Sequence, residues 1–191
     1  MANEFYALMG RMRNITRWSL MRNTFSENIQ EHSHQVAILA HALALIRREI
    51  LLLDGPDPDK CAVAALYHDA SETLTGDMPT PIKYYNPEIR AAYKQVERIA
   101  GERLLQMLPQ QLHPFYESVL MESNPEVEPI VKAADKLSAY IKCVEEQKAG
   151  NTEFESAAIQ TMTAMKEMGR EELDWFIAEC LPAFSLNLDQ L

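Results

Sequence analysis

Apolar residues recur at helical spacing along most of this chain, and the prolines fall between the periodic stretches. This pattern predicts helices over about residues 2–13, 29–50, 58–73, 86–108 and 127–149, with a last helical segment from about residue 153. Residues 109–123 are interrupted by prolines and leave room for one short helix. No Val/Ile-rich alternating stretch and no internal repeat occurs, so the chain is predicted to be all-α.

The histidines of the 29–50 helix fall into two groups when they are placed at about 100° per residue. His32 begins an apolar stripe that faces the core, and Asn28 with Glu31 forms a capping-box pattern just before it. The stripe continues through Val36, Leu39, Leu43, Ile46 and Ile50. His34 and His41 point to the opposite side, so they are interpreted as surface or interface residues. His32 differs from an ordinary core histidine because it lies in the first turn, at the mouth of the core.

The stretch from Tyr67 to Glu72 places polar groups at the end of a helix that is otherwise small and apolar. His68 and Asp69 are adjacent there, and burying the charge of Asp69 requires a metal ion, an arginine or a lysine nearby. Neighbouring helical side chains diverge by about 100°, but at a helix end both can bend toward one ion. Residues 74–81 follow with a glycine and two prolines, and predict a non-helical loop that either lines a pocket or merely connects two helices.

Four residues from three helices form a possible ligand set for one divalent metal ion: His32, His68, Asp69 and Asp135. Two imidazoles and two carboxylates suit Co, Mn, Mg, Fe or Zn, so the ligand types do not select the metal. On its own spacing, Asp135 would be interpreted as a surface carboxylate. A metal-bound water would be a nucleophile near neutral pH, and the ion would offset the negative charge of a phosphate.

Two further residues fit the chemistry of a phosphate ester. Glu72 could donate a proton to a leaving oxygen or accept one from water. Arg17 could clamp a phosphate through two hydrogen bonds. The alternative for the Arg17-Trp18 pair is a surface arginine beside a core tryptophan, and the local sequence alone favours that alternative. His113 lies between the His-Asp pair and Asp135 and is interpreted as a non-ligand.

Composition narrows the choice of partners. The 191 residues are 47% hydrophobic, enough for one globular domain, and the net charge of −10 without a basic stripe argues against a nucleic-acid polymer. The three cysteines are far apart and form no C-x-x-C pair, which predicts reduced thiols in a cytoplasmic protein. No signal-peptide pattern and no membrane-spanning apolar run appears, so no membrane partner is expected.

The order His, His-Asp, Asp on an all-α chain resembles the HD superfamily of metal-dependent phosphohydrolases. Further stretches resemble the bacterial 5'-deoxynucleotidase family more closely. They are Arg17-Trp18, Met21-Arg22-Asn23, Glu27-Asn28, Glu31-His32-Ser33, Tyr67-His68-Asp69-Ala70-Ser71-Glu72, Thr75-Gly76-Asp77, Pro79-Thr80-Pro81 and Lys132-Ala133-Ala134-Asp135. The resemblance covers most of the chain and thins toward the C-terminus. It implies a single HD domain over residues 1–191, with a core of about 26–150 and C-terminal helices of about 153–181 packed on it.

The resemblance also implies a reaction, in which a deoxyribonucleoside 5'-monophosphate and water give the deoxyribonucleoside and phosphate. By this likeness the four residues above bind the metal, Glu72 is the acid/base group and Arg17 orients the phosphate. The catalytic residues that it implies are Glu72, Arg17 and Asp69. Trp18 would pack against C2' of the sugar and exclude a 2'-hydroxyl. The substrate-binding residues implied in full are Arg17, Trp18, Asp69, Asp77, Met78, Pro79, Thr80 and Asp135. Members of this family are typically homodimers, so a homodimer is expected.

Two alternative functions are compatible with part of this pattern. An HD phosphohydrolase could act on a cyclic nucleotide or a nucleoside triphosphate. The first would want more histidines before Asp135 than His113 alone, and the second more basic residues than the few near the motifs. A non-catalytic nucleotide sensor could hold an inert metal, but it would have no use for the proton donor Glu72.

Overall fold

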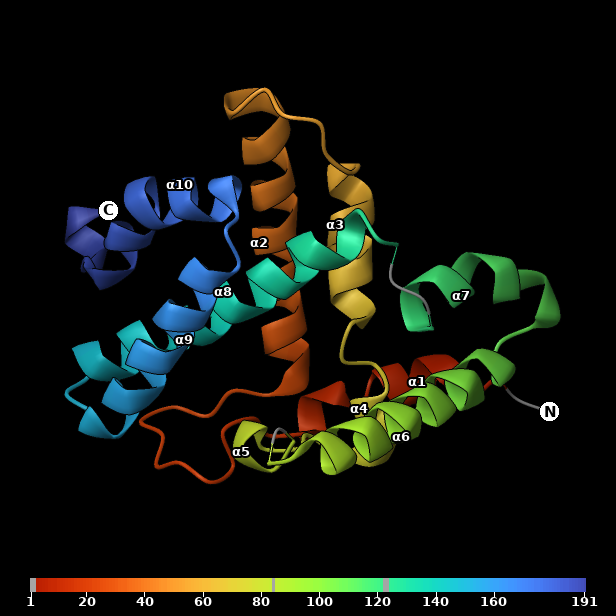
Figure 1. The fold of residues 1–191 in the computed structure, drawn as a ribbon. Coiled ribbons are helices and arrows are strands. Elements are labelled where there is room, and N and C mark those ends of the chain that lie inside the picture. The colour runs from red at the N-terminus through yellow and green to blue at the C-terminus, as the bar shows by residue number, and fades with distance from the viewer. Residues whose placement is uncertain (1–2, 84, 122–123) are drawn as a thin grey trace.

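The computed structural model describes residues 3–83, 85–121 and 124–191 (Figure 1). Within these ranges the secondary structure is helical, and the one extended pairing is an antiparallel bridge between Thr16 and Asn28. The α-helices are α1 (Phe5–Met9), α2 (Ile29–Leu45), α3 (Pro58–Tyr67), α4 (Glu72–Thr75), α5 (Thr80–Lys83), α6 (Pro87–Gln106), α7 (His113–Leu120), α8 (Val127–Lys148), α9 (Glu155–Glu167) and α10 (Glu171–Glu179). A π-helical stretch, Ile46–Ile50, continues α2. The prediction of an all-α fold is confirmed.

The centre of the molecule is built from three helices, with α2 and α3 packed side by side and α8 crossing both (Figure 1). Helix α9 packs along α8, and α10 adds apolar side chains to the same core. The core members with no exposed surface are Val36, Ala40, Leu43, Ala44, Cys61, Ala65, Ile130, Ala133, Ala134, Leu137, Ile141, Met165 and Leu173. Each large aliphatic side chain buried in this way contributes about 1.5–3 kcal/mol. The core therefore fixes the relative positions of α2, α3 and α8, which carry the predicted ligands.

The start of α2 follows the expected local chemistry. The Asn28 side chain accepts a hydrogen bond from the Glu31 amide, and the Glu31 side chain accepts one from the Asn28 amide. These two bonds satisfy backbone groups that have no partner within the helix. The first turn of α2 is thereby held in place, and His32 lies in that turn.

Two boundaries differ from the predictions. The predicted 58–73 helix ends at Tyr67, because the next amides bond three residues back: Ala70 to Tyr67 and Glu72 to Asp69. This tightening ends the α-helical hydrogen-bond pattern, although His68 itself keeps helical dihedral angles (φ −59°, ψ −33°). In the resulting turn, His68 Nε2 and Asp69 Oδ2 lie 3.2 Å apart. The predicted 74–81 loop is partly helical, because α4 extends to Thr75 and α5 starts at Thr80.

The apolar stripe of α2 is also shorter than predicted. Val36, Leu39, Leu43 and Ile46 are buried as expected, whereas Ile50 is 49% exposed. Ile50 ends the π-helical stretch, whose wider turn moves it off the stripe of the preceding α-helix.

A second apolar cluster packs around the turn that follows α3. Its buried members are Phe5 of α1, Ala70 of that turn, Leu104 of α6 and Leu108 just after α6. Because Ala70 immediately follows Asp69, this packing anchors the turn that carries Asp69. Among the described residues, no helix combines the length and hydropathy needed to cross a membrane.

Candidate metal centre and active site

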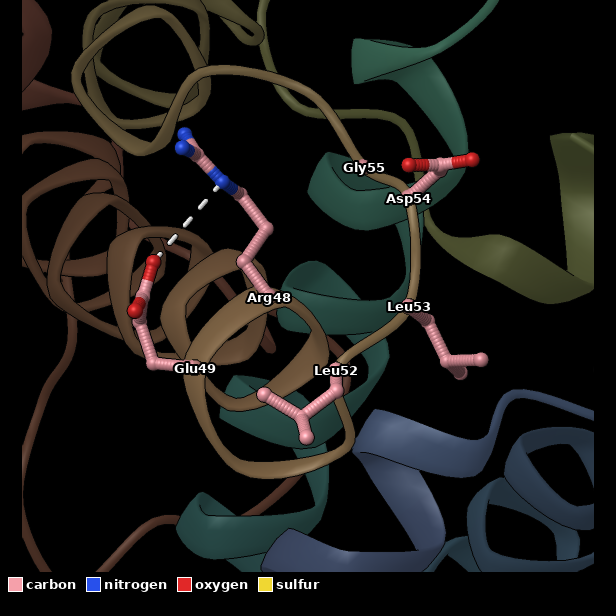
Figure 2. Close-up of a pocket in the computed structure, with 6 residues that line it drawn as sticks. All are labelled: Arg48, Glu49, Leu52, Leu53, Asp54 and Gly55. Carbon is pink, nitrogen blue, oxygen red and sulfur yellow. Dashed lines mark ion pairs between the residues drawn. The ribbon is translucent and has the colours of Figure 1, made fainter.

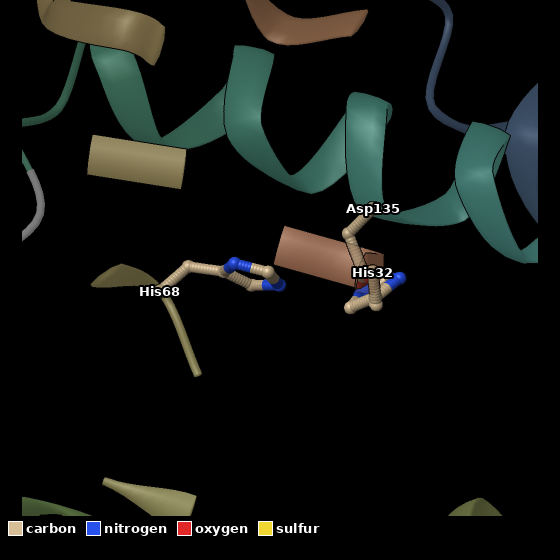
Figure 3. A group of neighbouring side chains, drawn as sticks. All are labelled: His32, His68 and Asp135. Carbon is tan, nitrogen blue, oxygen red and sulfur yellow. The ribbon is translucent and has the colours of Figure 1, made fainter. Parts of the chain in front are cut away.

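Three of the four predicted ligands come together at the crossing of the central helices. One possible donor atom from each of His32, His68 and Asp135 lies within 4.8 Å of the others (Figure 3). His32 lies in the first turn of α2, His68 directly follows α3, and Asp135 is in α8. The core packing that joins these helices thus brings together side chains that are far apart in the sequence.

Asp69, the fourth predicted ligand, adjoins the same cluster. Its Oδ2 atom lies 3.2 Å from Nε2 of His68 and 3.6 Å from Nε2 of His32. Oδ1 of Asp135 approaches His32 Nε2 from another direction, at 3.2 Å. Each imidazole Nε2 atom therefore faces carboxylate oxygens.

The other nitrogen of each ring is engaged by the surrounding chain. His68 Nδ1 lies 2.7 Å from the carbonyl oxygen of Ala65, which can only accept, so Nδ1 carries the proton. His32 Nδ1 lies 3.1 Å from the hydroxyl of Ser138, and that hydroxyl donates its own hydrogen to Gln35 Oε1 at 2.7 Å. Ser138 must therefore accept from His32 Nδ1. In its neutral form each ring therefore carries its hydrogen on Nδ1 and presents an Nε2 lone pair to the centre, which is the tautomer that metal ligation needs.

The buried Nε2 atoms of His32 and His68 have no hydrogen-bond partner among the described residues. A lone pair that faces carboxylate oxygens in a buried space is unfavourable unless a cation lies between them. The donor set therefore fits a divalent metal ion. Two imidazole nitrogens and nearby carboxylates are ligands shared by several transition metals.

The ionisable groups of the site shift one another's pKa values. Burial would raise the pKa of Asp69, but the neighbouring His68 outweighs it and holds the pKa well below its usual range. For Asp135 burial is likewise outweighed by the adjacent imidazole of His32, and the pKa is lowered. Burial would lower the pKa of His68, yet Asp69 raises it to about 9.

Glu72 lies next to this cluster and is only 6% exposed. One of its carboxyl oxygens, Oε2, is buried without a hydrogen-bond partner in the described chain. Burial, followed by the charges of Asp69 and Asp77, raises the pKa of Glu72 to about 9. A carboxyl group that stays protonated at neutral pH is suited to donate a proton.

The Arg17-Trp18 pair approaches the centre from the loop that precedes α2. The guanidinium Nη1 of Arg17 lies 3.6 Å from Asp69 Oδ2, which places a cation beside the possible metal ligands. The Trp18 ring is half-buried and packs against Phe154, with ring centroids 5.3 Å apart. The sequence alone favoured a surface arginine beside a core tryptophan, whereas both side chains are half-buried, Arg17 beside Asp69 and Trp18 against Phe154.

The predicted nucleotide-pocket residues follow α4. Gly76 adopts φ +75°, which turns the chain, and Asp77, Met78 and Pro79 are half-buried in the segment that leads to α5. The charge of Asp77 acts on both Arg17 and Glu72. Thr80 begins α5, and its side chain lies outside the described part of the structure.

The remaining histidines lie outside this cluster. His34 is exposed, His41 pairs with Asp59 at 3.6 Å, and Nε2 of His113 contacts the carbonyl oxygen of Leu108. These positions agree with their interpretation as non-ligands.

Sequence reasoning assigned no role to two residues that hold the site in place. Ser138 holds His32, and it follows Asp135 by three residues on α8, a spacing that could have indicated it. Glu27 contacts both Arg17 and Trp18; the stretch Glu27-Asn28 belongs to the family resemblance, but that resemblance assigned Glu27 no role.

A separate surface hollow lies at the far end of α2. It is lined by Arg48, Glu49, Leu52, Leu53, Asp54 and Gly55 (Figure 2). From His32 to Arg48 the helix rises by about 24 Å, at about 1.5 Å per residue. The hollow is therefore distinct from the histidine and carboxylate cluster.

An all-α bundle with this cluster defines a class, the HD-domain phosphohydrolases. The solved structure of an HD-domain phosphohydrolase from Listeria innocua matches with a TM-score of 0.77 and 25% identity, over 95% of this chain and 88% of that one. A cyanophage S-2L HD phosphohydrolase, solved with dA and one catalytic Zn²⁺ ion, shares the fold at a TM-score of 0.65 and 21% identity, over 92% of this chain and 95% of that one.

The sequence comparisons identify a particular family within the HD-domain phosphohydrolases. The family model described as "5'-deoxynucleotidase YfbR-like" matches residues 4–184. Proteins named 5'-deoxynucleotidase from Erwinia tasmaniensis and Vibrio atlanticus are 46% and 45% identical over 99% of this chain, and 96% and 98% of their own lengths are covered. The chain belongs to the YfbR-like 5'-deoxynucleotidase family. The predicted family, and with it a phosphoric monoester hydrolase, is confirmed.

Proposed function

We propose that this chain hydrolyses deoxyribonucleoside 5'-monophosphates to deoxyribonucleosides and phosphate at the crossing of α2, α3 and α8. The observation that carries the proposal is the pair of buried Nε2 lone pairs that face carboxylates beside Arg17 and Glu72. The dA-bound HD neighbour and the names of the close relatives support a nucleotide substrate.

In this proposal His32, His68, Asp69 and Asp135 hold one divalent ion. Such an ion would lower the pKa of a water molecule, so that hydroxide would be available near neutral pH to attack phosphorus. It would also offset the charge of the phosphate. Co, Mn, Mg, Fe and Zn remain candidates. Ser138 and the Ala65 carbonyl keep the two imidazoles in the tautomer that presents Nε2 to the ion.

Arg17 binds the phosphate with its guanidinium hydrogens, because its Nη1 atom already points toward Asp69 and the centre. Positive charge at this place also reduces the repulsion that a phosphate would meet from Asp69, Asp77 and Asp135. Glu72 donates its proton to the 5'-oxygen as the bond to phosphorus breaks, so that the deoxyribonucleoside leaves as a neutral alcohol.

Trp18 selects the sugar by packing against C2', where its flat ring leaves neither space nor a hydrogen-bond partner for a 2'-hydroxyl. Asp77, Met78, Pro79 and Thr80 form part of the nucleotide pocket. The homodimer and the cytoplasmic location stay predictions, the latter supported by three free cysteines.

The experiment that tests the proposal compares phosphate release from dAMP and AMP by protein that has been stripped of metal and reloaded with Mn or Co. Fast release from dAMP with little from AMP is expected. In Trp18→Ala, release from AMP should rise toward that from dAMP while metal content stays the same. Release from neither nucleotide by metal-loaded protein would move the substrate to another phosphate ester.

A further inference from the structure

Glu27 makes two contacts with a single oxygen atom. Its Oε2 accepts a hydrogen bond from Arg17 Nε at 3.0 Å and another from Trp18 Nε1 at 2.9 Å. The Glu27 side chain is only 11% exposed, so water competes weakly for this oxygen. The residue proposed to bind phosphate and the residue proposed to read the sugar therefore share one acceptor.

The backbone places Glu27 directly opposite this pair. The Arg17 amide donates to the Glu27 carbonyl oxygen at 2.9 Å, and Thr16 and Asn28 form the adjacent bridge. Asn28 is also the N-cap of α2, whose first turn carries His32. Glu27 thus connects Arg17 and Trp18 to the N-terminal end of α2, which also positions His32.

Trp18 needs such support because its backbone is strained. Its φ of +57° lies in the left-handed region, which is unfavourable for a bulky side chain. The surroundings hold it there: the Asn23 side chain and the Met21 amide donate to its carbonyl oxygen, at 3.3 and 2.9 Å. Phe154 packs against its ring. The indole nitrogen is fixed by Glu27, and this contact sets the rotation of the ring plane.

The same oxygen determines which edge of Arg17 faces the centre. Nε is engaged by Glu27, while Nη1 lies 3.6 Å from Asp69. A guanidinium held at Nε cannot rotate freely, so its terminal nitrogens keep a fixed direction toward a phosphate.

We propose that Glu27 is a positioning residue that determines specificity, because one carboxylate oxygen aligns both the phosphate-binding arginine and the deoxyribose-reading tryptophan. The proposal rests on the proposed function and adds to it that the two selections are coupled. Loss of Glu27 should impair phosphate binding and sugar discrimination together, whereas loss of Trp18 should impair discrimination alone.

The first test measures kcat/KM for dAMP and AMP in Glu27→Ala and Glu27→Gln. Hydrogen bonds to a charged group correspond to about 10- to 100-fold effects, so Glu27→Ala should lower the dAMP-to-AMP ratio by about that factor and raise KM for dAMP. Glu27→Gln keeps an acceptor oxygen but not the charge, and should recover most of the ratio. Metal affinity should be unchanged in both. Glu153→Ala, which removes an exposed carboxylate beside Phe154, is the matched control.

A double-mutant comparison separates a positioning role from a general structural one. If Glu27 acts on sugar selection through Trp18, then Glu27→Ala should not lower the ratio further in a Trp18→Ala background. Equal ratios in wild type and Glu27→Ala, with normal folding, would overturn the proposal.

The last arm needs no substrate. The chain has two tryptophans, so Trp175→Phe leaves Trp18 as the only indole fluorophore. In that background Glu27→Ala should make Trp18 more accessible to acrylamide quenching, and unchanged quenching would overturn its positioning role. If the wild type fails to prefer dAMP, the proposed sugar selection is wrong, and the quenching result still decides the role of Glu27.

Discussion

Two buried glutamates of this molecule differ in almost every electrostatic respect. Glu146 of α8 is fully buried, yet its pKa is lowered to about 2, because bonds from Lys142, Asn151 and Thr24 outweigh the cost of burial. Glu72 is buried to a similar degree, and its pKa is raised to about 9. Burial is therefore not what separates these two residues; the difference lies in what surrounds each carboxyl group.

The surroundings of Glu146 form a closed network. Lys142 Nζ lies 2.5 Å from Glu146 Oε1 and also donates to the carbonyl oxygen of Phe25. The other oxygen, Oε2, accepts from the Thr24 amide and hydroxyl and from the Asn151 side chain. The network therefore ties the loop before α2 to α8, and its function is structural.

The surroundings of Glu72 are open by comparison. Glu72 Oε2 and the Nε2 atoms of His32 and His68 are buried without hydrogen-bond partners in the described ranges. Unsatisfied buried polar atoms are costly, and they persist where an ion or a substrate completes them. The comparison teaches that completeness of hydrogen bonding, rather than charge or burial, separates the structural cluster from the candidate active site.

The largest expected effect concerns the proton of Glu72. Glu72→Gln should lower kcat for dAMP by about 10²–10⁴-fold, because an amide cannot donate the proton to the leaving oxygen. In the wild type, kcat should fall as the pH rises through the pKa of Glu72, and this limb should be absent from the residual activity of the variant. A pH series of steady-state rates measures both. Full turnover by Glu72→Gln would contradict the role assigned to Glu72.

The same substitution has a consequence for stability. In the unfolded chain the Glu72 carboxyl group has the ordinary glutamate pKa of 4.5, whereas in the folded protein its pKa is raised to about 9. Between these two pH values the unfolded chain releases this proton more readily, so the free energy of unfolding falls as the pH rises. Glu72→Gln should therefore raise the free energy of unfolding of the metal-free protein at pH 7 by up to about 3 kcal/mol. Urea denaturation at pH 4 and pH 7 tests this, since the gain should nearly vanish at pH 4.

Next in size is the loss of Lys142 from the closed network. Lys142→Ala leaves the Glu146 carboxylate buried without its cation and should lower the free energy of unfolding by about 3–5 kcal/mol. The double variant Lys142→Met with Glu146→Leu removes both charges and should recover much of that loss. Chemical denaturation measures both variants. Metal affinity should stay close to wild type in the double variant, and its loss would mean that the two clusters are not separate.

The smallest effect is expected at Ser138, which accepts the Nδ1 hydrogen of His32. Ser138→Ala should weaken metal binding by about 10- to 100-fold, because His32 loses the contact that fixes its tautomer and ring orientation. The free energy of unfolding should also fall by about 1–3 kcal/mol, because the buried Nδ1 hydrogen of His32 is left without its acceptor. Metal titration of Ser138→Ala and of Ser118→Ala, an exposed serine on α7, provides a matched pair.

Much of this arrangement could be predicted from the sequence, because helical spacing and caps are local properties. Asn28 and Glu31 define the start of α2, and the position of His32 at the mouth of the core follows from them. The break after Tyr67 could not be predicted in this way, since the 58–73 stretch has no glycine or proline after Pro58 to indicate it. That break depends on tertiary packing of Ala70 against α1 and α6.

Residues that act on other residues were harder to predict. Ser138 and Lys142 look like ordinary polar positions in the sequence, and their contacts appear only when distant segments meet. Glu27 stands in a stretch of the family resemblance, but its contacts with Arg17 and Trp18 appear only in the structure. The pocket stretch from Asp77 to Pro79 was indicated by resemblance alone, because nothing in its spacing distinguishes a pocket wall from a connector.

We expect the open cluster of His32, His68, Asp69 and Asp135 to hold one divalent ion, and a metal titration decides whether it does. Isothermal titration of EDTA-stripped protein with Mn²⁺ or Co²⁺ should show one site per chain in the wild type and in the Lys142→Met/Glu146→Leu variant. The site should be lost in His68→Ala. Binding of equal strength in His68→Ala, or no binding by the folded wild type, would contradict the account.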